Sequence, residues 1–185
     1  NEYEYNEIKL INKANILQDD NILELGSCIG ITAIHLKRKL RTGNLFCIEP
    51  NPSAYKCLVK NLQMNNIIAK TYNAVGSVNE KYIDFKIDQE NFLSCNGKKN
   101  LIIEIKSINI NNMISKFNIN TLLIDVEGFE IEIFNKINFL NIKTLIIELH
   151  PDIYGQKKLD KILTFLKRNY KISDKSNSVY CFSRL

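Results

Sequence analysis

Short apolar runs alternate with helix-like segments along most of this chain, and this alternation restricts its possible folds more than any other feature. Five runs have the length of buried strands: 21–25, 45–48, 68–72, 121–126 and 143–149. Segments with apolar residues at helical spacing follow most of them. Apolar strands that alternate with helices predict a mostly parallel sheet with helices on both faces.

The two ends and the middle of the chain add further elements. Residues 3–17 read as an amphipathic helix, so residues 1–20 form a lead-in to the sheet. The runs 82–87 and 101–108 alternate as strands do, and the polar stretch 88–99 between them reads as a loop. Two last strands are expected at 171–173 and 179–183, joined by a turn over 174–178, and such a pair indicates an antiparallel edge. The fold class is therefore doubly wound α/β, which binds ligands beyond the carboxyl ends of its strands.

Length and composition indicate one globular domain over residues 1–185. A chain of 185 residues with 45% hydrophobic and 24% charged residues can bury a substantial core. The net charge of +5 comes from dispersed lysines, which favours a solvated surface over a nucleic-acid patch. No apolar run approaches about 18 residues, so no membrane span is expected.

The five cysteines are scattered and form no Cys-x-x-Cys motif, and only two histidines accompany them. This pattern lacks the spacing of a zinc site and favours small buried thiols in a reducing compartment. The first residues have neither the basic start nor the apolar core of a signal peptide. We therefore expect a cytoplasmic location.

The turn after the first strand carries two glycines and is followed, about 20 residues later, by an acid. The turn reads Glu24-Leu-Gly26-Ser27-Cys28-Ile-Gly30, and the second strand ends at Glu49. Glycines let the backbone approach a ligand and open a helix whose first N–H groups are free. In doubly wound folds the acid accepts hydrogen bonds from ribose hydroxyls. Together these features favour a nucleoside-type cofactor over the alternative of a tight turn and a surface glutamate.

Two missing nucleotide-binding motifs and the negative charge of Glu24 limit which cofactor this turn can bind. The dinucleotide fingerprint Gly-x-Gly-x-x-Gly is missing because Cys28 occupies its middle position, and there is no Gly-Lys-Ser/Thr. Glu24 at the start of the turn would repel a pyrophosphate. The same acid would suit the cationic amino-acid part of S-adenosylmethionine, which is therefore favoured over NAD.

Four motifs in order resemble those of the FkbM family of S-adenosylmethionine-dependent methyltransferases. They are "LELGSCIG" (23–30), "IEPNP" (48–52), "LIDVEGFE" (123–130) and "IIELHP" (146–151). The resemblance covers about Ile22 to Pro151. It implies a Rossmann-like seven-stranded methyltransferase sheet, mostly parallel with an antiparallel last strand, which agrees with the fold class read from the alternation.

Three positions depart from the family pattern. Ser27-Cys28 stands where the family commonly has Ala-Asn, Leu123 where it commonly has Lys, and Asn109 where it often has Asp. The first departure puts polar contacts from the turn in doubt, and the second means that this chain works without that lysine.

The candidate site residues lie where strands end. We expect cofactor contacts from the turn, the second and third strand ends and the fourth motif: Glu24, Gly26, Ser27, Gly30, Glu49, Asn51, Asn73 and Asp125. Val75 is a further candidate for the adenine edge. The candidate catalytic residues are His150 as a neutral base, Asp125 as a group that holds the cofactor's ammonium or orients the acceptor, and Glu127 as a ligand of substrate hydroxyls.

Glu148 reads as a supporting residue. Such acid clusters also hold Mg²⁺ in some sites, but no further Asp or Asn follows Glu148, so the prediction is a site without a metal.

The predicted reaction is O-methylation of a hydroxyl on a sugar, glycan or secondary metabolite, with acceptor contacts from residues 1–20 and an insertion at 76–110. Three alternatives remain: a methyltransferase of nucleic acid, an oxidoreductase on a related sheet, and a non-catalytic cofactor-binding relative. The first is disfavoured because Asp125-Val-Glu-Gly stands where amino-methylating enzymes carry Asp/Asn-Pro-Pro-Tyr/Phe. The oligomeric state is left open.

Overall fold

The computed structural model describes residues 4–78, 82–88, 100–134 and 136–185. Most of the predicted polar loop at 88–99 lies outside the described residues. Seven strands form the main sheet, in the spatial order β3-β2-β1-β7-β8-β10-β9. Their bounds are β1 Ile22–Leu25, β2 Leu45–Ile48, β3 Lys70–Tyr72, β7 Thr121–Ile124, β8 Thr144–Glu148, β9 Tyr170–Ser176 and β10 Val179–Arg184.

The first five strands of this order, β3 to β8, pair in parallel, and β10 runs antiparallel to both β8 and β9. The predicted seven-stranded Rossmann-like sheet with an antiparallel last strand is therefore confirmed. Several boundaries differ from the prediction. β3 and β7 are shorter than the predicted 68–72 and 121–126, and β9 continues to Ser176, so the last turn is shorter than the predicted 174–178. The chain steps outward from β1 to β3 and then returns to the other side of β1 with β7. This reversal makes the carboxyl ends of β1 and β7 the topological switch point.

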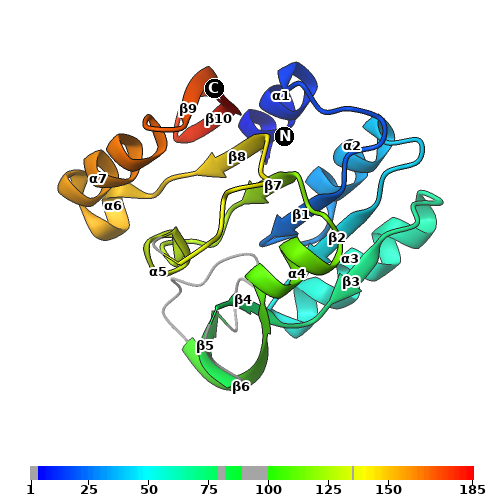
Figure 1. Ribbon diagram of the computed structural model, residues 1–185. Coiled ribbons are helices and arrows are strands. Elements are labelled where there is room, and N and C mark those ends of the chain that lie inside the picture. Colours follow the sequence, from blue (N-terminus) through cyan, green and yellow to red (C-terminus); the bar gives the residue numbers. More distant parts are fainter. Residues whose placement is uncertain (1–3, 79–81, 89–99, 135) are drawn as a thin grey trace.

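Helices cover both faces of the sheet, as Figure 1 shows. They are α1 Tyr5–Lys13, α2 Ile31–Lys39, α3 Pro52–Met64, α4 Ile110–Lys116, α5 Glu130–Phe134, α6 Pro151–Tyr154 and α7 Gln156–Leu166. The predicted helix at 129–137 is shorter than expected, and the short helix α6 was missed because its four residues show no periodicity.

The two faces form two hydrophobic clusters, and alternate strand residues supply each one. Ile22 packs with residues of α1, α2 and α3, whereas Leu23 and Leu25 pack with residues of α4, α5 and α7. Glu24 alternates with them and therefore points to the same face as Ile22, beneath α1 and α2. This orientation decides what Glu24 can touch.

A second, three-stranded sheet follows β3 in the chain, in the order β4-β6-β5. Its strands are β4 Val75–Ser77, β5 Tyr82–Asp88 and β6 Asn100–Asn109. β4 is too short to show a pattern and was not predicted. This sheet is drawn in green at the bottom of Figure 1, apart from the strands of the main sheet.

Asparagine caps hold the ends of α3 and α4. The Asn51 side chain accepts a hydrogen bond from the Ser53 N–H at 2.9 Å, and Asn109 accepts one from the Asn112 N–H at 3.0 Å. Such caps stabilise a helix by about 1 kcal/mol. The Asn109 amide also donates to the Val78 carbonyl at 2.7 Å. An aspartate could cap the helix but could not make this second bond, so the departure at Asn109 ties α4 to the end of β4.

Candidate functional site

A cavity of about 370 Å³ opens at the carboxyl ends of β1, β2 and β7. Strand tips and their turns form one part of its wall, and β4, β5 and α6 complete it. The lining residues are Leu25, Gly26, Cys28, Ile48, Glu49, Pro50, Asn51, Val75, Gly76, Ile83, Asp84, Phe85, Lys86, Asp125, Val126, Glu127, Gly128, Phe129 and Ile153. The strand-end rule therefore located the cavity correctly.

Gly26 brings the first turn against the end of β7. A Cβ atom at this position would lie 1.7 Å from the Asp125 carbonyl oxygen, closer than any side chain allows. The N–H groups of Gly26 and Ser27 donate to the Ile48 carbonyl at 3.0 and 3.1 Å. The turn is thus fixed between β2 and β7, and a larger residue at position 26 would displace one of them.

Glu49 is buried and held in one orientation. Its Oε2 accepts a hydrogen bond from the Cys28 N–H and its Oε1 accepts one from the Asn51 N–H, both at 2.7 Å. Burial raises its pKa to about 7, although the two backbone N–H groups act in the opposite direction. Each carboxyl oxygen keeps a lone pair that can accept a further hydrogen bond from a ligand.

Glu24 lies inside the protein and does not line the cavity. It is fully buried, and burial raises its pKa even though the polar groups of Ser27, Thr32 and Cys47 act in the opposite direction. Neither of its carboxyl oxygens makes a well-formed hydrogen bond within the part of the chain that the structure describes. Its neighbour in register on β7 is Leu123, so no cation stands beside it there.

The other predicted cofactor contacts divide between the cavity wall and positions behind it. Asn51 borders the cavity, whereas Ser27 and Gly30 are buried outside its lining. Asn73 also lies outside the lining, where its amide donates to the carbonyls of Glu49 and Pro50 at 2.9 and 3.0 Å. Val75, the second candidate for the adenine edge, does line the cavity.

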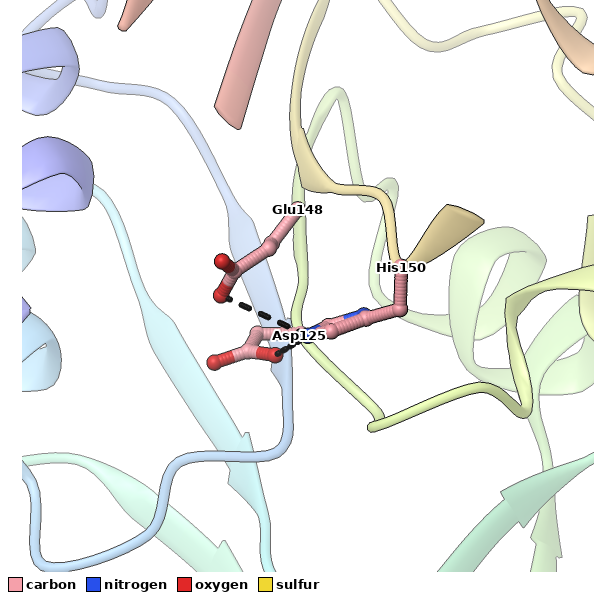
Figure 2. A group of neighbouring side chains, drawn as sticks. All are labelled: Asp125, Glu148 and His150. Carbon is pink, nitrogen blue, oxygen red and sulfur yellow. Dashed lines mark ion pairs between the residues drawn. The ribbon is translucent and has the colours of Figure 1, made fainter. Parts of the chain in front are cut away.

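His150 lies among four carboxyl groups. Its Nδ1 is 2.7 Å from Glu130 Oε1, and its Nε2 is 3.8 Å from Glu148 Oε2 and 3.9 Å from both Asp125 Oδ1 and Glu127 Oε2. In Figure 2 the imidazole ring of His150 points toward the carboxyl groups of Asp125 and Glu148. The structure therefore brings together the three predicted catalytic residues. Of these, Asp125 and Glu127 line the cavity and His150 does not.

The same groups shift one another's protonation. Burial tends to lower the pKa of His150, but the hydrogen bond and charge of Glu130, with the charges of Asp125 and Glu148, raise it to about 9. Burial and the charge of Glu148 raise the pKa of Asp125 well above its usual range. Burial also raises the pKa of Glu127. The pKa of about 9 favours a protonated His150 ring at neutral pH, and the protonation of His150 and that of Asp125 depend on each other.

Several residues that support the cluster were not identified from the sequence. Glu130 is fully buried and also accepts a hydrogen bond from the Gly128 N–H at 3.0 Å. Ser178 donates to Glu148 Oε1 at 2.6 Å, and the Tyr154 hydroxyl accepts the His150 N–H at 3.0 Å. Glu7 of α1 lies against Glu148, and burial raises the pKa of Glu7 to about 7. Glu130 stood within a quoted motif, but Glu7 and Ser178 come from distant segments and carried no sequence signal.

Glu4 is a further missed acid, near the first turn. Its Oε2 accepts a hydrogen bond from the Thr32 N–H at 3.0 Å, at the start of α2. Burial and the nearby Glu24 raise its pKa to about 8. Two glutamates thus lie close together on the α1 and α2 side of the sheet.

Asp125, Glu148 and His150 each offer one possible metal-ligand atom, and these atoms lie within 4.8 Å of one another. They are the residues that could hold a divalent cation. The sequence predicted a site without a metal, and that stays a prediction.

The solved structures that resemble this one are methyltransferases and related Rossmann-like proteins with low sequence identity. TrmK of M. capricolum, in complex with S-adenosyl-homocysteine, has a TM-score of 0.54 at 14% identity, over 96% of this chain and 67% of that one. The fibrillarin pre-rRNA processing protein of Methanococcus jannaschii has a TM-score of 0.57 at 14% identity, over 92% and 69%. The precorrin-6y C5,15-methyltransferase of Geobacter metallireducens has a TM-score of 0.53 at 12% identity, over 95% and 84%. These likenesses support the fold.

Among the described residues, no helix is long and apolar enough to cross a membrane. No curated protein matches the chain by sequence. The sequence profile of the methyltransferase FkbM domain, in contrast, matches residues 24–172, which is most of the chain and includes the four motifs apart from Leu23 at the start of the first. The chain therefore belongs to the FkbM methyltransferase domain family.

Proposed function

We propose that this protein is an S-adenosylmethionine-dependent methyltransferase that methylates a hydroxyl group of a sugar, glycan or secondary metabolite. The observation that carries the proposal is the cavity at the switch point, which has a fixed Glu49 in one part of its wall and the acids Asp125 and Glu127 in another. Membership of the FkbM family supplies the reaction class. The neighbour TrmK, which holds S-adenosyl-homocysteine in its crystal structure, supports the same cofactor.

The residues of the cavity fit S-adenosylmethionine. Glu49 is oriented by two backbone N–H groups and can accept hydrogen bonds from ribose hydroxyls. Ile48 and Val75 offer apolar surface for the adenine. Asp125 is the predicted partner of the cofactor's ammonium or of the acceptor. Because Glu24 is buried beneath the turn, we assign it an indirect part in cofactor binding, through the position of that turn.

The bound cofactor supplies a methyl group on a positively charged sulfur. The acceptor oxygen forms a bond to the methyl carbon while the carbon–sulfur bond breaks, and the acceptor loses its proton. The protein has to align the reacting atoms and receive that proton. Glu127 stands at the cavity wall, where it can bind acceptor hydroxyls.

The proposed proton acceptor is the carboxyl group of Asp125 at the cavity wall, with the protonated ring of His150 behind it. His150 Nε2 lies 3.9 Å from Asp125 Oδ1, and Glu130 fixes the ring through Nδ1. A carboxyl group whose pKa is raised above its usual range is a better base than an ordinary aspartate. This proposal differs from the prediction that His150 is a neutral base, because the acids around His150 favour its protonated form.

The regions proposed to contact the acceptor are the insertion at 76–110 and the lead-in segment 1–20. β5 of the insertion lines the cavity, which supports the first assignment. The scattered cysteines support a reducing compartment, for which we propose the cytoplasm.

Calorimetry with S-adenosylmethionine, S-adenosylhomocysteine and NAD tests the proposal directly. We expect both sulfur compounds to bind at micromolar or tighter concentrations and NAD to bind at least about tenfold more weakly, because Glu49 and the cluster acids repel a pyrophosphate. The same titration in excess EDTA is the control for a required metal, and we expect unchanged affinity. Failure of both sulfur compounds to bind would contradict the proposed function.

A further inference from the structure

The hairpin of β5 and β6 has one apolar face and one polar face. Its register pairs Ile83 with Ile105 and Phe85 with Ile103, and opposed residues of an antiparallel pair lie on the same side. The alternate positions carry Tyr82, Asp84 and Lys86 on β5 opposite Lys106, Glu104 and Ile102 on β6. The hairpin thus presents a continuous strip of Ile83, Phe85, Ile103 and Ile105, here called the apolar strip.

The apolar strip reaches the cavity. Ile83 and Phe85 line it, and they are only partly buried, whereas Ile105, the cross-strand partner of Ile83, is buried. Phe129, after β7, and Ile153 of α6 also line this cavity, and Ile153 is 45% exposed. Four large apolar side chains from three separate segments therefore border one space that already contains Asp125. Apolar surface left partly open beside polar groups is typical of a ligand pocket.

The charge of the cavity wall limits what can occupy this space. Three acidic residues of the lining, Glu49, Asp125 and Glu127, come from the strand ends, whereas Asp84 and Lys86 of the lining belong to the polar face of the hairpin and oppose each other in charge. Glu148 and Glu130 contact His150, whose protonated ring offsets part of their negative charge. A phosphorylated or otherwise anionic acceptor would meet repulsion from this wall. A hydroxyl or amino group of the acceptor could instead donate a hydrogen bond to a carboxylate at the apolar-lined end of the cavity.

We infer that the methyl acceptor is an uncharged or cationic molecule with a flat apolar body, which rests on Ile83 and Phe85 while its hydroxyl group reaches Asp125. This inference rests on the proposed function and selects, within it, an apolar secondary metabolite over a free sugar, a sugar phosphate or a nucleic acid. Phe85 and Ile153 are then specificity residues, and the cofactor is held without them.

Two dyes that share one ring system test the inference. N-phenyl-1-naphthylamine is neutral, and 1-anilinonaphthalene-8-sulfonate differs by an anionic sulfonate; both fluoresce in apolar sites. They are titrated into the protein saturated with S-adenosylhomocysteine. We expect the neutral dye to bind at least about tenfold more tightly than the sulfonate, because the acidic wall opposes the anion. Equal affinity, tighter binding of the sulfonate or no binding of the neutral dye would overturn the inference.

Three variants locate the binding site. Phe85→Ser removes the aromatic ring of the apolar strip and should weaken the neutral dye about tenfold or more. Ile153→Ser, at an exposed position where folding is not at stake, should weaken it by a smaller factor. Tyr82→Ser is the matched control, because Tyr82 is 59% exposed on the opposite face, and it should leave the affinity unchanged. Unchanged affinity in both Phe85→Ser and Ile153→Ser, or a loss in Tyr82→Ser, would overturn the assignment.

Calorimetry with S-adenosylhomocysteine distinguishes a failure of the proposed function from a failure of the acceptor assignment. Failure of the unmodified protein to bind it contradicts the proposed function, whereas the dye measurements report on the apolar strip. Ile153→Ser and Phe85→Ser should retain cofactor affinity within about twofold. A large loss of S-adenosylhomocysteine binding in both variants would place the cofactor on this wall and would overturn the acceptor assignment.

Discussion

Glu49 and Asp125 follow the parallel strands β2 and β7, which flank β1, and both residues line the same cavity, yet their surroundings differ. Both oxygens of Glu49 accept backbone N–H groups, and its pKa is raised only to about 7. Oδ1 of Asp125 is buried and accepts no hydrogen bond from the described residues, and other carboxyl groups surround it. Position at a strand end therefore places an acid at a site, while its hydrogen-bond partners decide whether it holds a ligand rigidly or exchanges a proton.

The largest effect is expected when the fixed acid is removed. Glu49→Ala should weaken S-adenosylhomocysteine about 10- to 100-fold, since a hydrogen bond to a charged group contributes about 1.5–3 kcal/mol. Calorimetry measures this affinity. Glu104→Ala, on the exposed strand β6, is the control and should leave it unchanged. If both variants bind like the unmodified protein, Glu49 does not contact the cofactor.

The second prediction concerns the cluster around Asp125. Glu130→Gln should lower the pKa of His150 in that cluster by about one unit. Because Glu130 is the largest favourable influence on protonated His150, its loss should lower the pKa of His150 from about 9 toward 6.5. NMR titration can measure this directly, because the chain has only two histidines and His35→Gln assigns the remaining signal.

Glu132→Gln, an exposed acid on the same helix, should leave the His150 titration in place. A midpoint of His150 that is identical in Glu130→Gln and the unmodified protein would show that the cluster does not control its protonation. Cofactor affinity should change little in either variant, which separates the cluster from Glu49.

The smallest expected effect concerns the pH dependence of stability, which includes Glu24 as a further buried acid. The pKa values of Glu49 and Glu7 are raised to about 7 and that of Glu4 to about 8, from 4.5. Stability from such groups is present below about pH 4.5 and is lost as pH rises through 7 to 8. His150, raised to about 9, acts in the same direction. The free protein should therefore unfold at a lower temperature at pH 8.5 than at pH 5.5.

Glu24→Gln removes one buried acid that destabilises the fold at high pH. The melting temperature of this variant at pH 8.5 should therefore be a few degrees above that of the unmodified protein. Differential scanning calorimetry at both pH values measures the change, with Glu132→Gln as the control. A melting temperature of Glu24→Gln below that of the unmodified protein at pH 8.5 would mean that Glu24 is stabilised as an anion.

Most of the fold was predictable because strand and helix periodicity is a local property of the sequence. β2 was predicted with its exact bounds, and the cap at Asn51 with Pro52 marked the start of α3 correctly. The misses were β4 and α6, which are too short to show a period, and the end of β9, where polar residues continue an edge strand. The seven-stranded sheet with an antiparallel last strand followed from the family resemblance, whereas the strand order came from the structure.

The site was predictable only in part. Strand ends identified Glu49, Asp125 and His150, because parallel strands bring their carboxyl ends to one edge. The burial of Glu24 followed from its alternate position on β1, yet the turn suggested a residue that faces a ligand. The contact of Glu7 with Glu148 and the bond from Ser178 to Glu148 join segments far apart in the chain, and no spacing signals them.

The sequence by itself determined the fold class, the family and the edge of the sheet where the cavity lies, since these depend on periodicity and on short motifs. Only the tertiary structure decided which acids are satisfied, which are exposed to the cavity and which shift the pKa of His150. Those properties depend on distances and burial between residues that the chain brings together from different strands, and electrostatic effects in a buried site change steeply with both.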